Sequence, residues 1–342
     1  MHVLVTGHTG FKGAWLSLLL GERGFDVSGI ALDPDPGSLF EIAEIGDVLR
    51  QDVRQDIRDR DATVSAIRRV APDVVIHMAA QPLVRRSYAE PRLTIESNVM
   101  GTLSVLEGIE AAGTVSAAVM VTTDKVYRNV GRGDGYEEAD ALGGRDPYSA
   151  SKSMADILVA SWAASFDSCP IAIARAGNVI GGGDVSKDRL VPDLIRGFMT
   201  GEPARLRNTE AVRPWQHVLD CLNGYLLLVD ELGSGAGSGA WNFGPDASSF
   251  RTVRDVADHA ARTWGHGARW ISDEREHPHE EAVLTLNAQR ARRELGWRDV
   301  LDFDDAVDWT VDWYKRVEEG SSPLDVTQEQ IKEYESRLGD RR

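Results

Sequence analysis

The chain begins with MHVLVTGHTGFKG (residues 1–13), in which a short apolar run leads directly into three glycines spaced three apart. In a strand–turn–helix unit, the first glycine permits the tight turn, the second lets the backbone approach a pyrophosphate, and the third allows close helix–strand packing. The start of the helix then offers free N–H groups and a partial positive charge to phosphates. This context favours dinucleotide binding over a purely structural turn. The predicted cofactor-binding residues here are Gly7, Thr9, Gly10, Phe11, Lys12 and Gly13.

Short β-like runs alternate with helical patterns through the first half of the chain. Apolar spacing near 3.6 indicates helices, and brief runs rich in β-branched residues or alanine indicate strands. We expect strands at 3–5, 27–32, 74–77, 117–122 and 171–176, and helices at 11–21, 62–70 and 99–112. Strands that alternate with helices predict βαβ units with right-handed crossovers. The expected fold class is therefore α/β, a Rossmann-type, doubly wound parallel sheet.

The second half is less regular. Three glycines at 181–183 break the pattern, and GSGAGSG at 233–239 indicates a loop. A short strand at 240–243 and helices at 253–264 and 287–295 indicate a smaller α+β lobe, with some segments returning to the first sheet. We expect a cofactor domain at 1–183 and 214–246, a substrate lobe at 184–213 and 247–330, and a polar, fraying tail at 331–342.

Charge and composition limit the classes of partner. The chain carries 38 basic and 54 acidic residues, a net charge of −16, which argues against a nucleic-acid partner because the phosphate backbone would be repelled. Its two cysteines are too few for a disulfide framework and suit a reducing compartment. The sequence opens without a basic leader, and its early apolar stretch at 14–20 is too short to cross a bilayer. We expect a cytoplasmic protein without a membrane partner.

The acid that holds the adenosine ribose is the first open question. Dinucleotide folds place such an acid near the end of the second strand. Asp33 lies 20 residues after Gly13 and could serve, although Ala31 could be the last strand residue. The charge of Asp33 favours NAD, and NADP stays open. Lys12 stands where an apolar residue is common, and the sequence leaves open whether it meets a phosphate, another side chain or solvent.

YSASK at 148–152 is a YxxxK string at the start of a helical segment. A spacing of four places Tyr148 and Lys152 on one helix face. An ammonium group beside a phenol favours phenolate and lowers the phenol's pKa. Tyr148 then becomes a usable base near neutral pH, and Lys152 its activator.

Together these strings resemble the extended short-chain dehydrogenases/reductases that act on nucleotide sugars, the NAD-dependent epimerase/dehydratase family. That family combines the glycine turn, a Ser/Thr hydroxyl matched here by Thr123, and YxxxK. Further matches are DI at 56–57, HMAAQ at 77–81, NVMGT at 98–102 and RAGNV at 175–179. The resemblance extends to about Tyr314. It implies that NAD also contacts Asp56, Ile57, Ala79, Ala80, Gln81, Asn98, Thr122, Tyr148 and Lys152.

Asp124 and Lys125 point to one reaction within that family. Epimerases generally lack an acid–base pair after the hydroxyl, whereas 4,6-dehydratases place extra ionisable groups there. The dTDP-glucose enzymes have Asp-Glu, and the Asp-Lys pair here resembles the CDP-glucose 4,6-dehydratases. Other strings that agree are GHTGFKG at 7–13, QPLVRRSY at 81–88, GGGDVSKDRLVPD at 181–193 and RPWQHVLD at 213–220.

The resemblance implies catalytic roles for Thr123, Asp124, Lys125, Tyr148 and Lys152. Tyr148 would deprotonate the glucose C4 hydroxyl, and Asp124 would protonate the leaving C6 hydroxyl. Lys125 would take the C5 proton, or else stabilise the enolate as a cation. Guanidinium groups match phosphate oxygens. The predicted substrate-binding residues are Asn178, Arg189, Arg213, Gln216 and His217.

Several alternatives stay open at this point. Another sugar-nucleotide 4,6-dehydratase, a UDP-sugar 4-epimerase or decarboxylase, a small-alcohol dehydrogenase and a non-catalytic NAD sensor share parts of the pattern. His277 and His279 have metal-like spacing but lack further ligands nearby, so we expect no metal. Relatives usually pair through two helices each, which implies a homodimer, or a tetramer, built on helices near 99–112 and 149–164.

Overall fold

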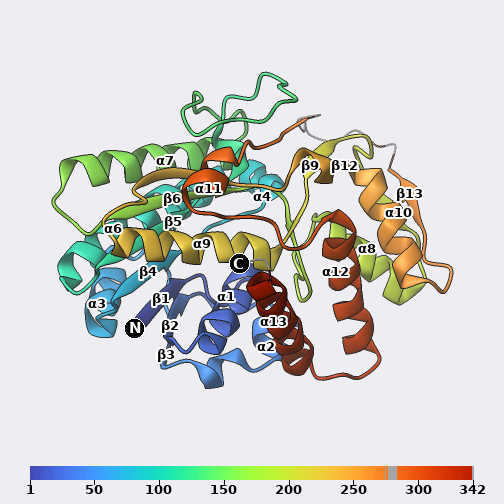
Figure 1. The fold of residues 1–342 in the computed structure, drawn as a ribbon, viewed down its shortest axis with the longest axis horizontal. Coiled ribbons are helices and arrows are strands. Elements are labelled where there is room, and N and C mark those ends of the chain that lie inside the picture. Colours follow the sequence, from blue (N-terminus) through green and yellow to red (C-terminus); the bar gives the residue numbers. More distant parts are fainter. Residues whose placement is uncertain (274, 276–282, 341–342) are drawn as a thin grey trace.

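The computed structural model describes residues 1–273, 275 and 283–340 (Figure 1). Within them, seven strands form one sheet in the order β11-β6-β5-β4-β1-β2-β3. Every neighbouring pair in this sheet is parallel. The strands are β1 (His2–Thr6), β2 (Asp26–Ala31), β3 (Gln51–Arg54), β4 (Val74–His77), β5 (Ala117–Val121), β6 (Ile171–Ala176) and β11 (Gly239–Phe243). The expected doubly wound α/β fold is confirmed.

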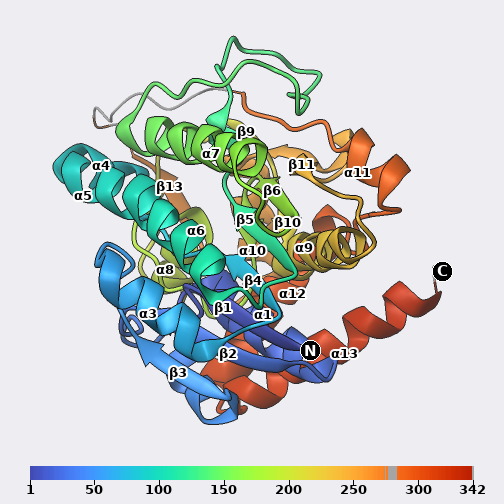
Figure 2. The same ribbon diagram turned by 90° about the vertical axis from the view of Figure 1, so that its left-hand side faces the viewer.

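Helices cover both faces of the sheet (Figure 2). One face carries α3 (Arg60–Val70), α6 (Gly101–Ala112) and α7 (Pro147–Ser165), and the other carries α1 (Phe11–Glu22) and α9 (Val218–Gly233). Successive strand residues point to opposite faces, so Val3 and Val5 join the core against α1 while Leu4 joins the core against α3. The sheet is thus buried on both sides.

The sequence located most of these elements but missed β3. Its residues alternate between half-buried and exposed, because β3 is the edge strand and lacks the apolar run of the central strands. The helix expected at 62–70 begins at Arg60, where the Asp59 carboxylate accepts a hydrogen bond from the Ala62 N–H and caps it. The helix expected at 99–112 begins at Gly101, after α5 (Pro91–Ile95) and a π-turn at Glu96–Met100.

The second half builds small structures beside the sheet. Three two-stranded pairs join β7 (Val179–Ile180) to β10 (Gln216–His217), β9 (Val212–Pro214) to β12 (Phe250–Thr252), and β8 (Ala204–Leu206) to β13 (Trp270–Ser272). The helices are α8 (Leu190–Thr200), α10 (Val253–Trp264), α11 (Gln289–Glu294) and α12 (Phe303–Glu318). The expected helix at 253–264 is confirmed, and a capping box of Thr252 and Asp255 begins it. The expected strand at 240–243 is β11, which returns to the large sheet beside β6.

Short elements complete the described chain: α2 (Leu39–Ile42), η1 (Ile45–Val48), α4 (Val84–Ala89), η3 (Asp124–Val126) and η4 (Ala247–Ser249). In this part of the chain no helix is both long and apolar enough to span a bilayer. The string at His277–Glu280 lies outside the described residues.

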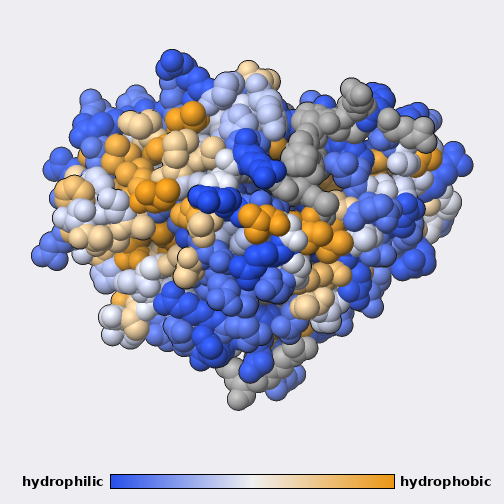
Figure 3. Space-filling model, turned by 90° about the horizontal axis from the view of Figure 1, so that it is seen from above, coloured by the Kyte–Doolittle hydropathy of each residue, from blue (hydrophilic) through white to orange (hydrophobic). Residues whose placement is uncertain are grey.

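Exposed apolar side chains gather along α7. Met154, Ile157 and Phe166, which directly follows the helix, are all more than a third exposed. Figure 3 shows hydrophobic residues on the left of the face seen from above, over α7. Contiguous exposed apolar surface of this kind marks an interaction site more often than a solvated face.

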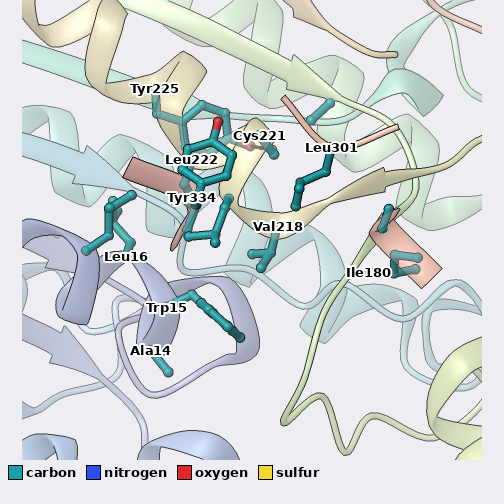
Figure 4. Close-up of a cluster of buried hydrophobic side chains, with 14 of the residues drawn as sticks. Ala14, Trp15, Leu16, Ile180, Val218, Cys221, Leu222, Tyr225, Leu301 and Tyr334 are labelled. Carbon is teal, nitrogen blue, oxygen red and sulfur yellow. Dashed lines mark hydrogen bonds between the residues drawn. The ribbon is translucent and has the colours of Figure 1, made fainter. Parts of the chain in front are cut away.

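The C-terminal helix α13 (Pro323–Asp340) is a folded element rather than the polar tail that we expected from 331. Ile331 and Tyr334 are fully buried in the core shared with α1 and α9. Figure 4 shows Tyr334 within this cluster. The Tyr334 hydroxyl donates to Asp220 Oδ1 at 2.9 Å. The expectation failed because the helix is polar on most of its surface, and its narrow apolar stripe is easily overlooked among the charges.

Candidate active site

A cleft opens at the carboxyl ends of the central strands. The cleft is lined by Phe11 and Lys12 at the glycine turn, by Thr123, Lys125, Tyr148 and Lys152 in its middle, and by Asn178, Arg189, Arg207 and Arg213 toward the second lobe. Doubly wound sheets bind ligands in this position, outside the carboxyl ends of the strands. Members of each predicted group, for the cofactor, the chemistry and the substrate, therefore line one cleft.

The glycine turn has the shape that a dinucleotide pyrophosphate needs. Gly7 has a φ of +76°, and a Cβ there would lie 2.8 Å from Ala79 Cα on β4's continuation. A Cβ at Gly13 would lie 2.1 Å from the Gly7 carbonyl oxygen, so only glycine lets α1 pack on the turn. A Cβ at Gly10 would meet nothing closer than 3.4 Å, which leaves the surface above the turn open. No described side chain caps α1 at Gly10, so the helix N-terminus faces this space uncapped.

The acid expected near the end of the second strand, Asp33, lies beyond that strand. β2 ends at Ala31, and Asp33 follows in an exposed loop, with Oδ1 3.9 Å from Arg54 Nε. Thr9 Oγ1 donates to the Leu32 carbonyl at 3.0 Å and fixes the turn against this loop. Arg54 is bound mainly by Asp52, at 2.6 Å. The sequence reading named neither Asp52 nor Arg54, because β3, which carries both, was missed.

His8, in the glycine turn, is a further residue that the sequence did not single out. Its Nε2 lies 2.8 Å from Asp52 Oδ1, and burial lowers its pKa. A Cβ at Gly29 would overlap its ring at 2.2 Å, so the glycine of β2 makes room for the imidazole. His8 therefore ties the glycine turn to β2 and β3.

The other predicted cofactor residues lie in and behind the wall of the cleft. Ala80 and Thr122 line the cleft, while Ile57 is buried against Gly101 and Asp56 is held by Arg58. Gln81 and Asn98 bond one another, because the Gln81 N–H donates to Asn98 Oδ1 at 2.7 Å and Asn98 Nδ2 donates back to the Gln81 carbonyl. Ala79 is half-buried beside Gly7. Gln81 and Asn98 thus shape the wall by holding each other.

Tyr148 and Lys152 lie in the first turns of α7, where the Asp146 carboxylate accepts from the Ser149 N–H and caps the helix. Both side chains are buried. Lys152 Nζ donates to the Val121 carbonyl at 2.9 Å. Burial raises the pKa of Tyr148 to about 12, although a hydrogen bond with Thr123 opposes this rise. The expected lowering of the Tyr148 pKa is therefore wrong for the protein alone, because the loss of water around the buried phenolate dominates.

Lys152 has a perturbed pKa as well. Burial and the nearby Lys12 ammonium lower the pKa of Lys152 to about 7. Lys12 itself donates to the Tyr225 hydroxyl at 3.0 Å. The question that the sequence left open for Lys12 thus has an answer, since its partner is another side chain.

Asp124 and Lys125 lie together at the end of β5. Asp124 is fully buried, and its Oδ1 accepts from Thr123 Oγ1 at 2.9 Å and from Lys125 Nζ at 3.2 Å. Its Oδ2 has no hydrogen-bond partner among the described residues. A Cβ at Gly177 would lie 3.3 Å from that oxygen, so this glycine leaves space beside it. Buried polar atoms are almost always bonded, so an oxygen without a partner is a candidate contact for a bound ligand.

Three of the five predicted substrate residues line the cleft, and two do not. Asn178, Arg189 and Arg213 border it. Gln216 is buried and donates to the Phe243 carbonyl at 3.0 Å. His217 is fully buried, with ring centroids 5.8 Å from both Trp15 and Trp309, and burial lowers its pKa to about 3. The prediction of substrate contacts is corrected for these two residues, which β10 turns into the core.

The far end of the cleft contains a group of charged side chains that the sequence did not predict as site residues. Asp188 Oδ1 lies 2.8 Å from Arg85 Nη1 and 3.4 Å from Arg207 Nη1, which joins α4 to the second lobe. Asp188 has a φ of +62°, which is uncommon for a residue with a side chain. Each of these residues except Arg207 falls within QPLVRRSY or GGGDVSKDRLVPD.

Comparisons with known proteins agree with this geometry. Residues 3–244 match the model of the "NAD dependent epimerase/dehydratase family". A CDP-glucose 4,6-dehydratase of Salmonella typhimurium is 41% identical over 98% of this chain and 96% of that protein. A dTDP-glucose 4,6-dehydratase of Streptomyces griseus is 30% identical over 94% of this chain and 97% of its own length. Among solved structures, dTDP-glucose 4,6-dehydratase from Streptomyces venezuelae, with NAD and TYD bound, superimposes with a TM-score of 0.80 at 27% identity and covers 95% of this chain and 100% of that one.

Proposed function

The chain belongs to the NAD dependent epimerase/dehydratase family, and we propose that within it this protein is a CDP-glucose 4,6-dehydratase. It converts CDP-D-glucose to CDP-4-keto-6-deoxy-D-glucose and water, a step in making 6-deoxy sugars. The observation that carries the proposal is the pair of Lys125, which lines the cleft, and the buried Asp124 that it and Thr123 bond, on a chain 41% identical to an enzyme of that name. Epimerisation at C4 needs no such pair.

The turn of Gly7, Gly10 and Gly13 would hold NAD, which would supply a hydride acceptor for C4 and return that hydride to C6 as a proton is returned to C5. The residues of the chain move the protons. Tyr148 accepts the proton of the C4 hydroxyl, and its hydrogen bond with Thr123 lowers the Tyr148 pKa and so favours the phenolate. Because burial disfavours the phenolate, Tyr148 depends on a nearby positive charge. Lys152 supplies that charge while it stays protonated.

Asp124 and Lys125 carry the elimination. A ketone at C4 acidifies the C5 proton, so a base can remove it while an acid protonates the departing C6 hydroxyl. Asp124 is the acid, and its Oδ2, which has no hydrogen-bond partner among the described residues, is the oxygen available to carry that proton. Lys125 is about a third exposed at the cleft and serves at C5, either as the base or as a cation that stabilises the enolate. Arg189 and Arg213 bind the pyrophosphate of the substrate.

The first experiment is a mass-spectrometric assay of the purified protein with NAD and CDP-glucose, run in parallel with UDP-glucose and dTDP-glucose. Loss of one water from CDP-glucose alone, without accumulation of NADH, is the expected result. Water loss from another of the three would move the proposal to a different sugar-nucleotide 4,6-dehydratase. Unchanged mass with galactose as product would replace it by an epimerase, and no reaction with any of them would favour a non-catalytic NAD protein.

Lys125→Met tests whether Lys125 acts in the reaction, as the C5 base or as the cation that stabilises the enolate, or has only a structural role. We expect this variant to bind NAD and CDP-glucose but to lose elimination, so that turnover falls at least 100-fold, as for loss of a general base. Lys187→Met, a lysine outside the lining of the cleft, is the matched control. Turnover of K125M within a few fold of the wild type would refute a role in C5 chemistry.

We also propose that the protein is a cytoplasmic homodimer built on the exposed face of α7 with α6. Met154, Ile157 and Phe166 supply the apolar surface that such a contact needs. The I157E variant should sediment as a monomer where the wild type sediments as a dimer. A tetramer would require a second contact, and a monomeric wild type would remove the proposal. The division into a cofactor domain at 1–183 and 214–246 and a substrate lobe at 184–213 and 247–330 belongs to the same proposal.

A further inference from the structure

We propose that Asp156 and Arg175 are positioning residues that hold the groups of the oxidation step and the groups of the elimination step in one fixed arrangement. This inference rests on the proposed dehydratase function. Neither residue lines the cleft, and neither contacts the reacting atoms in the assignment above.

Asp156 and Arg175 form a buried, two-pronged ion pair. Arg175 Nε donates to Asp156 Oδ2 at 2.9 Å, and Arg175 Nη2 donates to Asp156 Oδ1 at 2.7 Å. The two side chains are 1% and 4% exposed. Two parallel hydrogen bonds fix the orientation of both the guanidinium and the carboxylate plane. Buried charges need such well-formed pairing, because removing one partner leaves the other charge buried and uncompensated. The pair joins α7 to β6 directly behind the cleft.

The pair also holds both ends of the loop that carries Thr123, Asp124 and Lys125. On the near side, Thr122 Oγ1 donates to Asp156 Oδ2 at 3.0 Å. On the far side, Arg175 Nη1 donates to the Tyr127 hydroxyl at 2.8 Å, and that hydroxyl donates to Asn242 Oδ1 at 2.6 Å. The loop between Thr122 and Tyr127 is therefore clamped at its two ends by one buried ion pair.

The same pair reaches the oxidation groups through α7. Asp156 lies one helical turn after Lys152, and its carboxylate raises the pKa of Lys152 against burial and the Lys12 ammonium. His77 at the end of β4 also faces Lys152, and burial together with the Lys152 charge lowers the pKa of His77 to about 3, so that it is neutral. Tyr148, one turn before Lys152 on α7, lines the same cleft. Loss of the Asp156 charge would leave Lys152 facing Lys12, with the Arg175 guanidinium unpaired behind it. Lys152 would then give up its proton at lower pH.

The test compares D156N, R175K and Y127F with D299N as the matched control. Asp299 forms another well-shielded ion pair, with Arg292 at 2.8 Å, but lies outside the lining of the cleft. Each variant is measured as the full-length enzyme with NAD for kcat and KM with CDP-glucose, for the pH dependence of kcat, and for thermal unfolding. A purely structural pair would lower the unfolding temperature alone.

For D156N we expect the alkaline limb of the kcat profile to move about one unit to lower pH, because an adjacent opposite charge is worth about that much. We expect kcat to fall at least tenfold with KM within threefold. R175K keeps the positive charge but loses the two parallel hydrogen bonds of the guanidinium group. Its kcat should therefore fall about tenfold, while the alkaline limb of its kcat profile stays at the wild-type pH. Y127F should lower kcat by a few fold. D299N should change neither kcat nor the pH of the alkaline limb. Profiles and kcat values for D156N and R175K that match those of D299N would overturn the proposal.

Two further measurements keep the inference distinct from the proposed function. If D156N does not fold, R175K carries the test, since its charge remains buried and paired. If the wild type does not dehydrate CDP-glucose, the proposed function fails, and the positioning role is read from NAD affinity against pH, followed by tryptophan fluorescence. A loss of affinity that begins about one unit lower in D156N supports the role, and superimposable curves refute it.

Discussion

The buried carboxylate of Asp220 gives a sharp prediction about pH and stability. It accepts the N–H groups of Val300 and Leu301 at 2.7 and 3.2 Å and the hydroxyl of Tyr334 at 2.9 Å. Despite these donors, complete burial raises its pKa to about 7, from an ordinary value of 3.8. In the unfolded chain the same carboxyl loses its proton about three pH units earlier.

The sign and size of the effect follow from that difference. Because the folded-state pKa lies above the unfolded one, the stability linked to protonated Asp220 is fully present below about pH 4. It is lost progressively as pH rises toward 7 and stays lost above. About three units at 1.36 kcal/mol each give about 4 kcal/mol. D220N has no proton to lose at this position, so the wild type should lose about 4 kcal/mol relative to D220N between pH 4 and pH 8.

Urea unfolding at pH 4, 6 and 8, followed by tryptophan fluorescence, measures this difference. D33N, which changes a carboxylate with an 88% exposed side chain, is the matched control and should track the wild type at every pH. A free-energy difference between the wild type and D220N that stays constant within about 1 kcal/mol from pH 4 to pH 8 would refute the reasoning. It would mean that the three donors offset burial and keep Asp220 ionised.

Three other changes test the site and its support. G13A should weaken NAD binding at least tenfold in a calorimetric titration, since its Cβ would lie 2.1 Å from the Gly7 oxygen, whereas G21A, whose Cβ meets no described atom within 4 Å, should bind normally. Y148F should lower turnover 100-fold or more while NAD affinity stays within twofold, and turnover near the wild-type value would exclude Tyr148 as the base. Y334F should lower the free energy of unfolding by about 1–2 kcal/mol in urea, and an unchanged midpoint would show that its hydrogen bond to Asp220 contributes nothing.

The sequence predicted the parts of the molecule whose physics is local. The strand and turn at 1–13 are set by adjacent apolar residues and by glycines at positions where a side chain would be strained or would clash. Tyr148 and Lys152 share a helix face because their spacing of four places them there. Asp124 and Lys125 are neighbours along the chain, so their meeting at the end of β5 needed no tertiary information.

The failures all involve contacts between distant segments. Gln216 and His217 point into the core because β10 pairs with β7, and a two-residue strand leaves no pattern in the sequence. Tyr334 is buried by α1 and α9, which lie more than 100 residues away. The pKa of Tyr148 depends on how completely other elements exclude water from it, and neighbouring residues along the chain do not reveal that.

The position of β11 at the edge of the sheet has a consequence for synthesis on the ribosome. β11 pairs only with β6 in the large sheet, yet β6 ends at Ala176 and β11 begins at Gly239, so about 60 residues must be made in between. At about 5–20 residues per second this takes about 3–12 s. During that time the apolar strand IAIARA lacks its outer neighbour, and an unpaired strand edge is a template for aggregation. Slowed translation between these strands should therefore lower the yield of soluble nascent protein.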